Sequence, residues 1–549
     1  MLTLPSIVLL LGGAWRVLCE LRSPPLFTSL TEHALPAGSS HNPLQVNYGM
    51  AVTDVDGDGS LEIIVAGYNE PNLVLKYDAS SQRLVNLAQD DLDSPYYALR
   101  DEHGSSIGVA ACDIDGDGWE EIYFLNTNNA FSGTATYADK LFKHRNGRWE
   151  DILNDEVNVQ RGVTSWFAGR SVACIDRKGL GRYSIYVANY ASGSVGPHAL
   201  IEMDVLASDV IHGVVALSNV AKEAGVDKYT GGRGVTTGPI VNHNMSDIFC
   251  DNEYGPNFLF RNNGDGTFTD IAVDTGIADA TEHGRGVALA DFNRDGKTDI
   301  VYANWNGPHR LFLQTGEPGR IRFQDAATPE FALPSSARTL IATDFDNDQH
   351  LEVFFNNMAN KGHSSNRAFS IRHDNDGQLH VMKLNLGDAD EPAGTGTGGV
   401  VTDLNGDGTL ELLLSHGESK VQPLTVYTSA QGKGNNWLRV IPRTEAGAFA
   451  RGARVQLHME RSSPQLRIID GGSGYLCQME PVAHFGLAHD VGTRVEVTWP
   501  DGLTYSRRLS PADVNSVIEI PYPAKRSQHR TRLQVKWDLL LSYAEHGCG

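Results

Sequence analysis

The sequence has 549 residues, 41% of them hydrophobic, and a formal net charge of −22. This acidity argues against a protein that binds nucleic acid through the phosphate backbone. No apolar run of membrane-spanning length follows the N-terminus, so no transmembrane helix is expected, and the length suits several domains or one repeat array with a smaller domain.

The N-terminus carries a short apolar run, SIVLLLGGA, at residues 6–14. The run is too short to span a bilayer and is typical of a signal peptide, so we expect a signal peptide over residues 1–19 and a secreted protein. Cleavage after Ala14 would leave six cysteines and cleavage after Cys19 would leave five, and the sequence leaves both open.

A repeated loop motif first occurs in MAVTDVDGDGSLEIIVAG, where Asp54, Asp56, Asp58 and Glu62 occupy positions 1, 3, 5 and 9. Gly59 at position 6 lets the backbone turn sharply enough for these oxygens to converge. Calcium prefers six or more oxygen ligands at about 2.3–2.6 Å, which the alternate side chains and the carbonyl of position 7 would supply. The motif therefore predicts a calcium site.

Five copies of the loop keep this pattern, and from them we expect about five Ca²⁺ ions. The predicted ligands, with position 7 contributing its backbone carbonyl, are Asp54, Asp56, Asp58, Ser60 and Glu62; Asp113, Asp115, Asp117, Trp119 and Glu121; Asp291, Asn293, Asp295, Lys297 and Asp299; Asp344, Asp346, Asp348, His350 and Glu352; and Asp403, Asn405, Asp407, Thr409 and Glu411.

The loop that starts at Asp291 excludes an EF-hand. An EF-hand needs a bidentate acid at position 12 and a helix on each side, but position 12 here is Tyr302. The flanking runs GVALA and DIVYA are short, apolar and rich in β-branched residues, which favours two strands. A solvated acidic turn is the alternative for a single loop, and the repetition argues against it.

Two further copies have lost most of the ligands. The third copy keeps Asp176 but has Lys178 and Leu180 at positions 3 and 5. The fourth, aligned with the fifth at an offset of 52 residues, keeps only Asp247. We expect no metal in these two loops.

The seven copies recur every 52 to 63 residues, and each continues into two more strand-like runs. Four strands in each of seven units predict an all-β fold, a seven-bladed β-propeller over residues 26–430. The last unit lacks a fourth strand, and residues 26–31 (LFTSLT) resemble the fourth strand at residues 267–272 (TFTDIA). We therefore expect the N-terminal strand to close the ring. The run GTGTGG at residues 394–399 is interpreted as a flexible inter-blade loop.

Residues 435–523 form five short alternating strands and predict a small separate β domain. We expect residues 524–549 to be a basic, flexible tail. No H-E-x-x-H, G-x-S-x-G or C-x-x-C motif occurs, so no catalytic residue is assigned and we expect a protein that is not an enzyme. Asn244 starts a possible N-glycosylation triplet. The sequence does not decide whether Cys112 and Cys174 form a disulfide. They lie one and two residues before the first loop position of adjacent blades, so we expect their side chains on opposite sheet faces.

The repeats resemble the FG-GAP repeats of integrin α-subunit propellers, in which calcium hairpins line one face and partners generally bind the other. The runs ARGARVQL, GGSGYLCQMEPVAHFGLAHD and VEVTWPDG resemble the ASPIC/UnbV module. Together they are similar to the cartilage acidic protein family, secreted calcium-binding proteins of the extracellular matrix. Members often end in a cysteine-rich EGF-like module, but residues 524–549 hold only Cys548. The resemblance implies a platform for matrix or cell-surface proteins; the alternative is a secreted propeller enzyme acting on glycans or lipids.

Overall fold

The computed structural model describes residues 23–127, 132–317, 319–359, 364–374, 378–418 and 420–523. These residues form seven four-stranded antiparallel sheets and two further sheets. No helix among them is long and apolar enough to cross a membrane. The expected signal peptide and basic tail lie outside the described residues.

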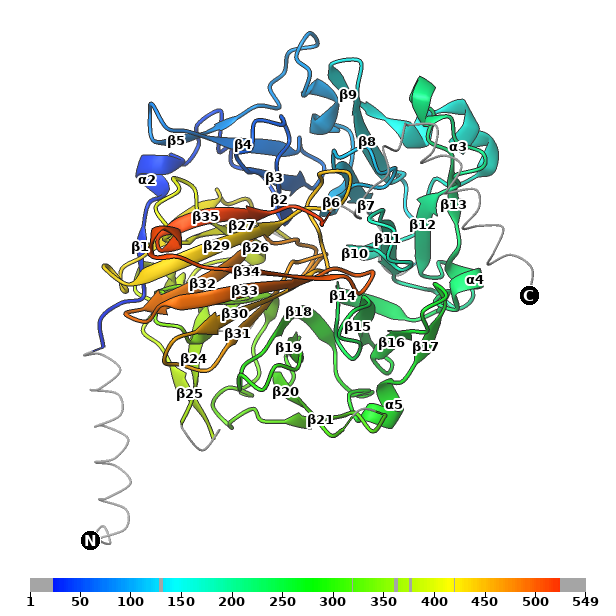
Figure 1. Ribbon diagram of the computed structural model, residues 1–549. Helices are drawn as coiled ribbons and strands as arrows, with labels where there is room; N and C mark the ends of the chain where they lie inside the picture. Colours follow the sequence, from blue (N-terminus) through cyan, green and yellow to red (C-terminus); the bar gives the residue numbers. More distant parts are fainter. Residues whose placement is uncertain are drawn as a thin grey trace, which may run out of the picture.

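The seven sheets are arranged as blades around a central axis (Figure 1). Each innermost strand packs against the innermost strands of both neighbouring blades, and contacts between the last and the first of these strands complete the ring. The chain is therefore a seven-bladed β-propeller, as predicted. From blade 1 to blade 7 the innermost strands are β2 (Asn47–Thr53), β6 (Ser106–Cys112), β10 (Gly169–Ile175), β14 (Gly231–Gly238), β18 (Gly284–Ala290), β22 (Ala337–Thr343) and β26 (Gly396–Thr402).

The outer strands of each blade follow in chain order. The second strands are β3 (Glu62–Gly67), β7 (Glu121–Asn126), β11 (Ser184–Asn189), β15 (Asp247–Glu253), β19 (Asp299–Asn304), β23 (Leu351–Asn357) and β27 (Glu411–His416). The third strands are β4 (Leu73–Asp78), β8 (Lys140–Arg145), β12 (Ala199–Met203), β16 (Phe258–Asn262), β20 (Arg310–Thr315), β24 (Arg367–His373) and β28 (Thr425–Ser429). The fourth strands are β5 (Arg83–Asn86), β9 (Arg148–Asp151), β13 (Leu217–Asn219), β17 (Phe268–Asp270), β21 (Arg322–Asp325) and β25 (Leu379–Lys383).

Blade 7 takes its fourth strand from the N-terminal end of the described chain. Strand β1 (Phe27–Ser29) pairs antiparallel with β28, with Phe27 opposite Ser429, which confirms the closure predicted from the sequence. Phe27 is fully buried, and its ring lies 4.9 Å from that of Phe345 in an edge-to-face contact. The short helices α2 (Thr31–Ala34), α3 (Glu156–Arg161), α4 (Ala221–Ala224) and α5 (Ala272–Thr275) lie beyond the fourth strands of blades 7, 2, 3 and 4.

The C-terminal domain packs across the ring and has its own apolar core, which includes Val455, Phe485 and Trp499. The sequence predicted five of its strands and missed two, β32 and β34. One sheet has the order β32 (Ala483–Ala488), β29 (Asn436–Pro442), β35 (Ser516–Ile520), and the other has the order β31 (Gln465–Ile468), β30 (Arg454–Met459), β33 (Gly492–Thr498), β34 (Thr504–Arg508).

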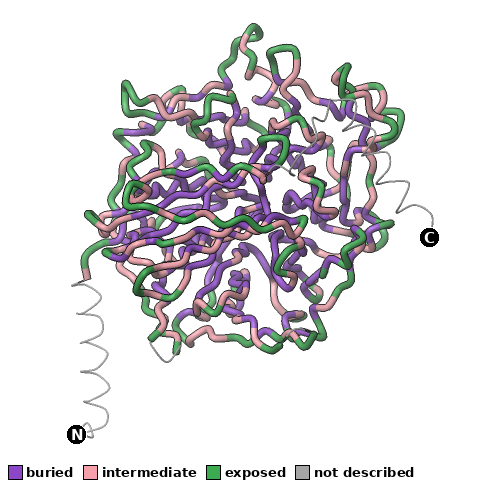
Figure 2. The backbone as a smooth tube through the Cα atoms, viewed as in Figure 1, coloured by how far each residue is buried: buried purple, intermediate pink, exposed green. Residues whose placement is uncertain are grey.

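One loop of this domain, residues 470–479, enters the centre of the propeller, and we call it the central loop. Its backbone bonds to several innermost strands: the Val287 N–H donates to the Gly474 carbonyl at 2.9 Å, and the Gln478 N–H donates to the Met50 carbonyl at 2.9 Å. Figure 2 shows the segments around the centre of the ring as buried. The loop therefore ties the domain to the ring from inside.

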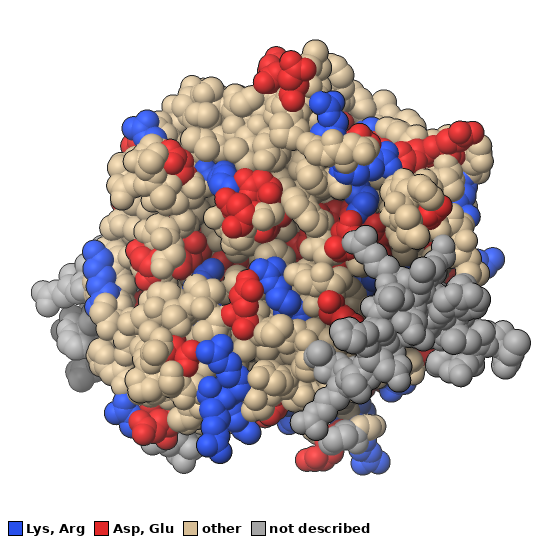
Figure 3. Space-filling view, turned by 45° about the horizontal axis from the view of Figure 1, so that its top comes forward, with Lys and Arg blue, Asp and Glu red and all other residues tan. Residues whose placement is uncertain are grey.

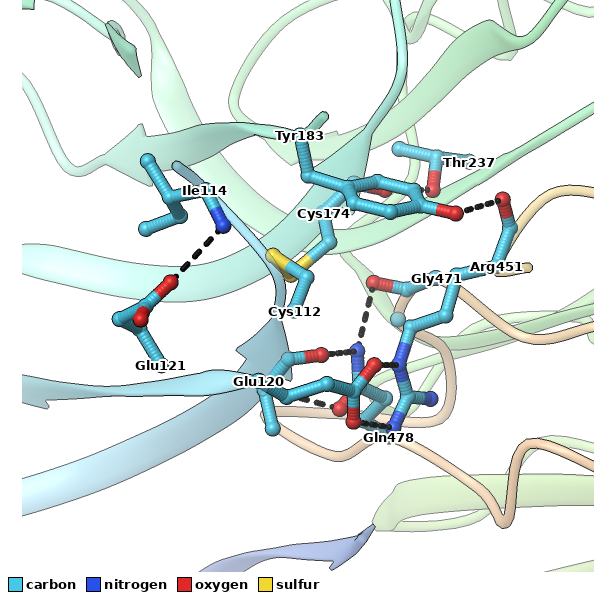
Figure 4. The surroundings of a disulfide bond; sticks show 12 residues. Cys112, Ile114, Glu120, Glu121, Cys174, Tyr183, Thr237, Arg451, Gly471 and Gln478 are labelled. Carbon is cyan, nitrogen blue, oxygen red and sulfur yellow. Dashed lines mark hydrogen bonds and ion pairs between the residues drawn. A yellow bond between two sulfur atoms is a disulfide. The ribbon is translucent and has the colours of Figure 1, made fainter. Parts of the chain in front are cut away.

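A disulfide joins Cys112 of β6 to Cys174 of β10, with the two Cα atoms 6.2 Å apart (Figure 4). The sequence left this disulfide open because the two cysteines were expected on opposite sheet faces. Neighbouring blades stack face against face, so side chains on opposite faces of adjacent blades meet, and the disulfide can form. Beside the bridge, Arg451 of the C-terminal domain forms a buried ion pair with Glu120 at 2.7 Å.

The glycine run at residues 394–399 is not the flexible loop expected from the sequence. From Gly396 onward it belongs to β26 and is buried. At Gly398 a Cβ atom would collide with the Tyr48 carbonyl of blade 1 and approach the Cys477 sulfur of the central loop. Glycine is needed here because two backbones approach closely.

Candidate metal centres

The five acid-rich loops connect the first and second strands of their blades and share one hydrogen-bond pattern. In blade 5 the Asp291 carboxylate accepts the N–H groups of Asp295 and Gly296 at 3.1 and 2.9 Å. Asp299 accepts the N–H of Phe292 at 2.9 Å. These bonds fix positions 1 and 9 of the loop, so two of the acids are oriented before any ion binds.

The same position 9 bond recurs in the other four loops. Glu62, Glu121, Glu352 and Glu411 accept the N–H of the second loop residue at 2.7 to 3.0 Å. The repeated geometry arises from the strand pairing, which places the position 9 acid opposite the last residue of the first strand, as with Glu62 opposite Thr53 and Glu411 opposite Thr402.

Position 6 adopts the left-handed backbone conformation in all five loops. The φ angle is 89° at Gly59, 97° at Gly118, and 80° at Gly296, Gly408 and Gln349. Gln349 is therefore the one position 6 residue of these loops that holds a side chain in this conformation, which L-residues disfavour by roughly 1 kcal/mol.

Three of the loops bring acidic oxygens within 4.8 Å of one another: Asp54, Asp56 and Asp58; Asp113, Asp115 and Glu121; and Asp344, Asp346 and Asp348. The loops of blades 5 and 7 have Asn293 and Asn405 at position 3, so an amide oxygen replaces one carboxylate. The position 7 residues donate their N–H to the position 5 acid at 2.7 to 3.0 Å in Ser60, Trp119, Lys297, His350 and Thr409.

Several of these oxygens are buried without a hydrogen-bond donor. Within the described chain, Asp56 Oδ1, Glu62 Oε1 and Asp115 Oδ1 have no hydrogen-bond partner, although Glu62 Oε1 lies 3.4 Å from Lys76 Nζ. Burial raises the pKa of Glu62 and of Glu411 to about 8, because the charged form is poorly solvated there. Clustered carboxylate oxygens without donors fit a hard divalent cation, so the residues present suit calcium.

Blades 1 and 2 add a lysine that the sequence analysis missed. Lys143 on β8 places its Nζ 3.0 Å from Asp115, 2.7 Å from Asp117 and 2.8 Å from Glu121. Lys76 on β4 lies in the same way against Asp56 and Asp58. Strand register could have revealed both, because each lysine faces the position 9 acid across the sheet. In blade 7 this place is taken by Thr428, whose hydroxyl donates to Glu411 at 2.9 Å.

The loops of blades 3 and 4 satisfy their remaining acid internally. Asp247 accepts the N–H groups of Val241, Asn242 and Asn262 at 2.8, 3.0 and 2.8 Å. In blade 3, Asp176 accepts the N–H groups of Leu180 and Gly181 at 3.0 and 2.7 Å. Neither loop gathers three acids among the described residues.

The C-terminal domain packs on the face of the propeller that carries the loops. Arg454 donates to the Gly296 carbonyl at 2.7 Å, and Gln349 donates to the Leu487 carbonyl at 2.7 Å. Arg439 lies 3.6 Å from Asp403. On the side shown in Figure 3, acidic side chains form separate groups, most of them beside a lysine or arginine, rather than one continuous patch.

Asn244, the possible glycosylation residue, lies exposed in the loop of blade 4. Its side-chain nitrogen is close to Gly502 of the C-terminal domain.

Two family models match the chain. One, described as an FG-GAP-like repeat, matches residues 54–124, 242–302 and 291–355. The other, described as ASPIC and UnbV, matches residues 443–542.

Curated relatives match over most of the chain. Cartilage acidic protein 1 from Homo sapiens is 66% identical over 502 residues, which cover 91% of this chain and 76% of the relative. The protein of that name from Xenopus tropicalis is 64% identical and is covered to 78%. Among solved structures, a lectin from Burkholderia pseudomallei aligns with 70% of this chain and 97% of its own at 12% identity and a TM-score of 0.42.

Proposed function

Because this chain belongs to the cartilage acidic protein family, we propose that it is a secreted matrix or cell-surface protein whose calcium-stabilised propeller presents a surface to other proteins. The observation that carries the proposal is the set of five loops with one hydrogen-bond pattern, three of which bring acidic oxygens within 4.8 Å of one another. A calcium ion would neutralise charge that these loops otherwise hold at close range.

The role of the ion is structural in this proposal. Each loop joins the two inner strands of its blade, and several loops also contact the C-terminal domain. Calcium would hold both arrangements, while the other face of the ring stays available for partners. No side chain of the loops is assigned a part in catalysis, because a carboxylate that ligates calcium is not available as an acid or base.

Ion counting tests the calcium sites. Native mass spectrometry of metal-stripped protein returned to calcium should show about five ions. The double variant Asp291→Asn/Asp299→Asn should lose one ion, whereas the matched control Asp247→Asn should keep all five. An ion count that does not change with calcium, or that falls in the control, would contradict the assignment.

The interaction role needs a second experiment. The intact protein should retain specific proteins from matrix and cell-surface extracts in calcium and release them in chelator. Calcium-dependent turnover of matrix polysaccharides or lipids by the purified protein would instead support an enzyme.

A further inference from the structure

Four arginines occupy one repeated position of the propeller. Six residues before the first loop position, the innermost strands of blades 3 to 6 carry an arginine in each case, and the other three blades carry other residues. The seven residues in blade order are Tyr48, Ile107, Arg170, Arg233, Arg285, Arg338 and Thr397. We call the four arginines the arginine arc, because consecutive blades place them side by side around the central axis.

The arc lies at the ends of the innermost strands opposite the calcium loops. Six residues of extended strand correspond to about 20 Å, so the arc and the loops are on opposite faces of the ring. Tyr475 at the tip of the central loop reaches the arc, with its hydroxyl 3.3 Å from Nη1 of Arg233. The arc and the loops are therefore separate sites.

Aromatic rings lie against the guanidinium groups. Arg233 lies 4.8 Å from the ring centre of Tyr190, and Arg338 lies 4.4 Å from that of Trp305. Arg285 shares Trp305 at 5.4 Å. Such contacts hold the planar groups in place with part of their edges unbonded.

The arc has more positive than negative charge. Glu253 pairs with Arg233 and lies 3.4 Å from Arg285, and Glu418 pairs with Arg338. Asp251 is also near, but it is fully buried and its pKa is raised well above its usual value by that burial. The two paired carboxylates, Glu253 and Glu418, together with the buried Asp251 thus face four guanidinium groups.

The guanidinium groups keep hydrogen-bonding capacity. Arg170, Arg285 and Arg338 are 8%, 4% and 9% exposed, so all three are at least nine-tenths buried. Their Nε atoms have no hydrogen-bond partner among the described residues. Burial, followed by the charge of Arg233, lowers the pKa of Arg285 to about 9. The pKa of Tyr475, which burial alone would raise, is lowered to about 8 by Arg233, Arg338 and the other two arginines.

We propose that the arginine arc binds a compact oxyanion, a sulfate ion or the sulfate group of a sugar ester. Guanidinium groups present N–H donors in a planar fork that matches such oxygens, and the doubly charged sulfate ion or the singly charged sulfate ester offsets excess positive charge of the arc. The arc lies beside Tyr475 of the central loop, at the opposite end of the innermost strands from the calcium loops, so an anion bound there would not contact those loops.

Trp305 provides a direct readout, because it contacts two of the arginines. The intact, calcium-loaded protein is titrated with sodium sulfate at constant ionic strength, with sodium chloride as the reference. We expect a saturable change in tryptophan fluorescence with sulfate and not with chloride. A parallel titration with N-acetylglucosamine 6-sulfate distinguishes the sources: binding of sulfate alone indicates the free ion, and binding of both indicates that an ester is accepted.

Two variants with opposite expected effects test the assignment. Arg285→Met should weaken sulfate binding at least tenfold, and Glu253→Gln, which removes a competing carboxylate, should tighten it severalfold. Arg507→Gln on the outer strand β34 is the control and should bind as the parent does. If Arg285→Met does not fold, Glu253→Gln still decides. Equal responses to sulfate and chloride, or unchanged affinity in both arc variants, would overturn the proposal.

Discussion

The loops of blades 3 and 4 and the five acid-rich loops all connect the first and second strands of their blades. The two groups differ in how the negative charge of their carboxylates is compensated. In blade 4, Asp247 is held by three backbone N–H groups from its own blade. In blade 2, the acids of the loop leave Asp115 Oδ1 without a donor, and Lys143 is the cation beside them. The hairpin can therefore form without an ion, and a cation is needed where carboxylates exceed internal donors.

Removing calcium with a chelator should have the largest effect on stability, because only the acid-rich loops depend on the ion. Each site at 100 times its Kd adds about 2.7 kcal/mol by mass action, and five such terms are comparable to the whole stability of a typical domain, about 5–15 kcal/mol. We expect EDTA to lower the melting temperature by many degrees in calorimetry. A melting temperature unchanged by EDTA would show that all seven loops are balanced internally.

The pH dependence should differ between calcium and chelator. The folded pKa values of Glu62 and Glu411, about 8, lie above the unfolded value of about 4.3. Protonation therefore stabilises the fold fully below about pH 4.3, and this contribution is lost as the pH rises through about 8. In chelator the melting temperature should fall from about pH 5 to about pH 8; in saturating calcium this fall should largely disappear.

Asp247→Asn should destabilise the protein equally with and without calcium. The amide has one acceptor oxygen where the carboxylate accepts from several N–H groups, so we expect a loss of about 2–3 kcal/mol in the free energy of unfolding. Asp291→Asn is the matched variant in an acid-rich loop, and its cost should appear mainly in calcium. Chemical denaturation in both conditions distinguishes them.

Lys143→Met should convert the loop of blade 2 into one that depends more on calcium. Removing the ammonium leaves its three acids without a cation, so we expect calcium affinity at this site to rise about tenfold, equivalent to ~1.4 kcal/mol. In chelator the variant should melt below the parent. Lys140→Met on the same strand removes an ion pair with Asp151 away from the loop and should leave affinity unchanged. Calorimetric titration of both variants measures the difference.

Gln349→Gly should have the smallest effect. Glycine relieves the left-handed conformation by roughly 1 kcal/mol, but the variant loses the bond to the Leu487 carbonyl, about 1 kcal/mol. Stability should change by less than about 1 kcal/mol, while calcium affinity of this loop rises slightly. Gln349→Ala loses the same hydrogen bond but keeps a Cβ atom in the left-handed conformation, so it should be less stable than Gln349→Gly. The reverse order would show that the backbone at position 349 is not strained.

Repetition made the propeller and its closing strand predictable, because seven copies of one pattern reveal a fold that a single copy does not. The left-handed backbone conformation at position 6 was predictable from the glycines of four loops. Gln349, the one residue with a side chain at this position, adopts the same conformation. The lysines of blades 1 and 2 were not predicted, because they lie on a different strand and reach the loop only through register.

Long-range features were harder to predict. The central loop reads in sequence as a glycine-rich turn of a small domain, and nothing local indicates that Tyr475 lies inside the propeller. The arginine arc is visible in the sequence once the repeats are aligned, but its chemistry depends on which carboxylates face it. Strands β32 and β34 were not predicted because neither shows alternating apolar and polar residues. The residues of β32 are buried on both faces, and those of β34 are mostly polar.

The pairing of β1 with β28 sets a delay during synthesis. Strand β1 leaves the ribosome first, but its partner follows roughly 400 residues later, which takes about 20 to 80 s at typical elongation rates. Throughout this interval Phe27 and the open edges of the growing ring are exposed. Folding of the nascent chain therefore depends on shielding these edges until blade 7 is made, and shortening the repeat array would shorten the exposure.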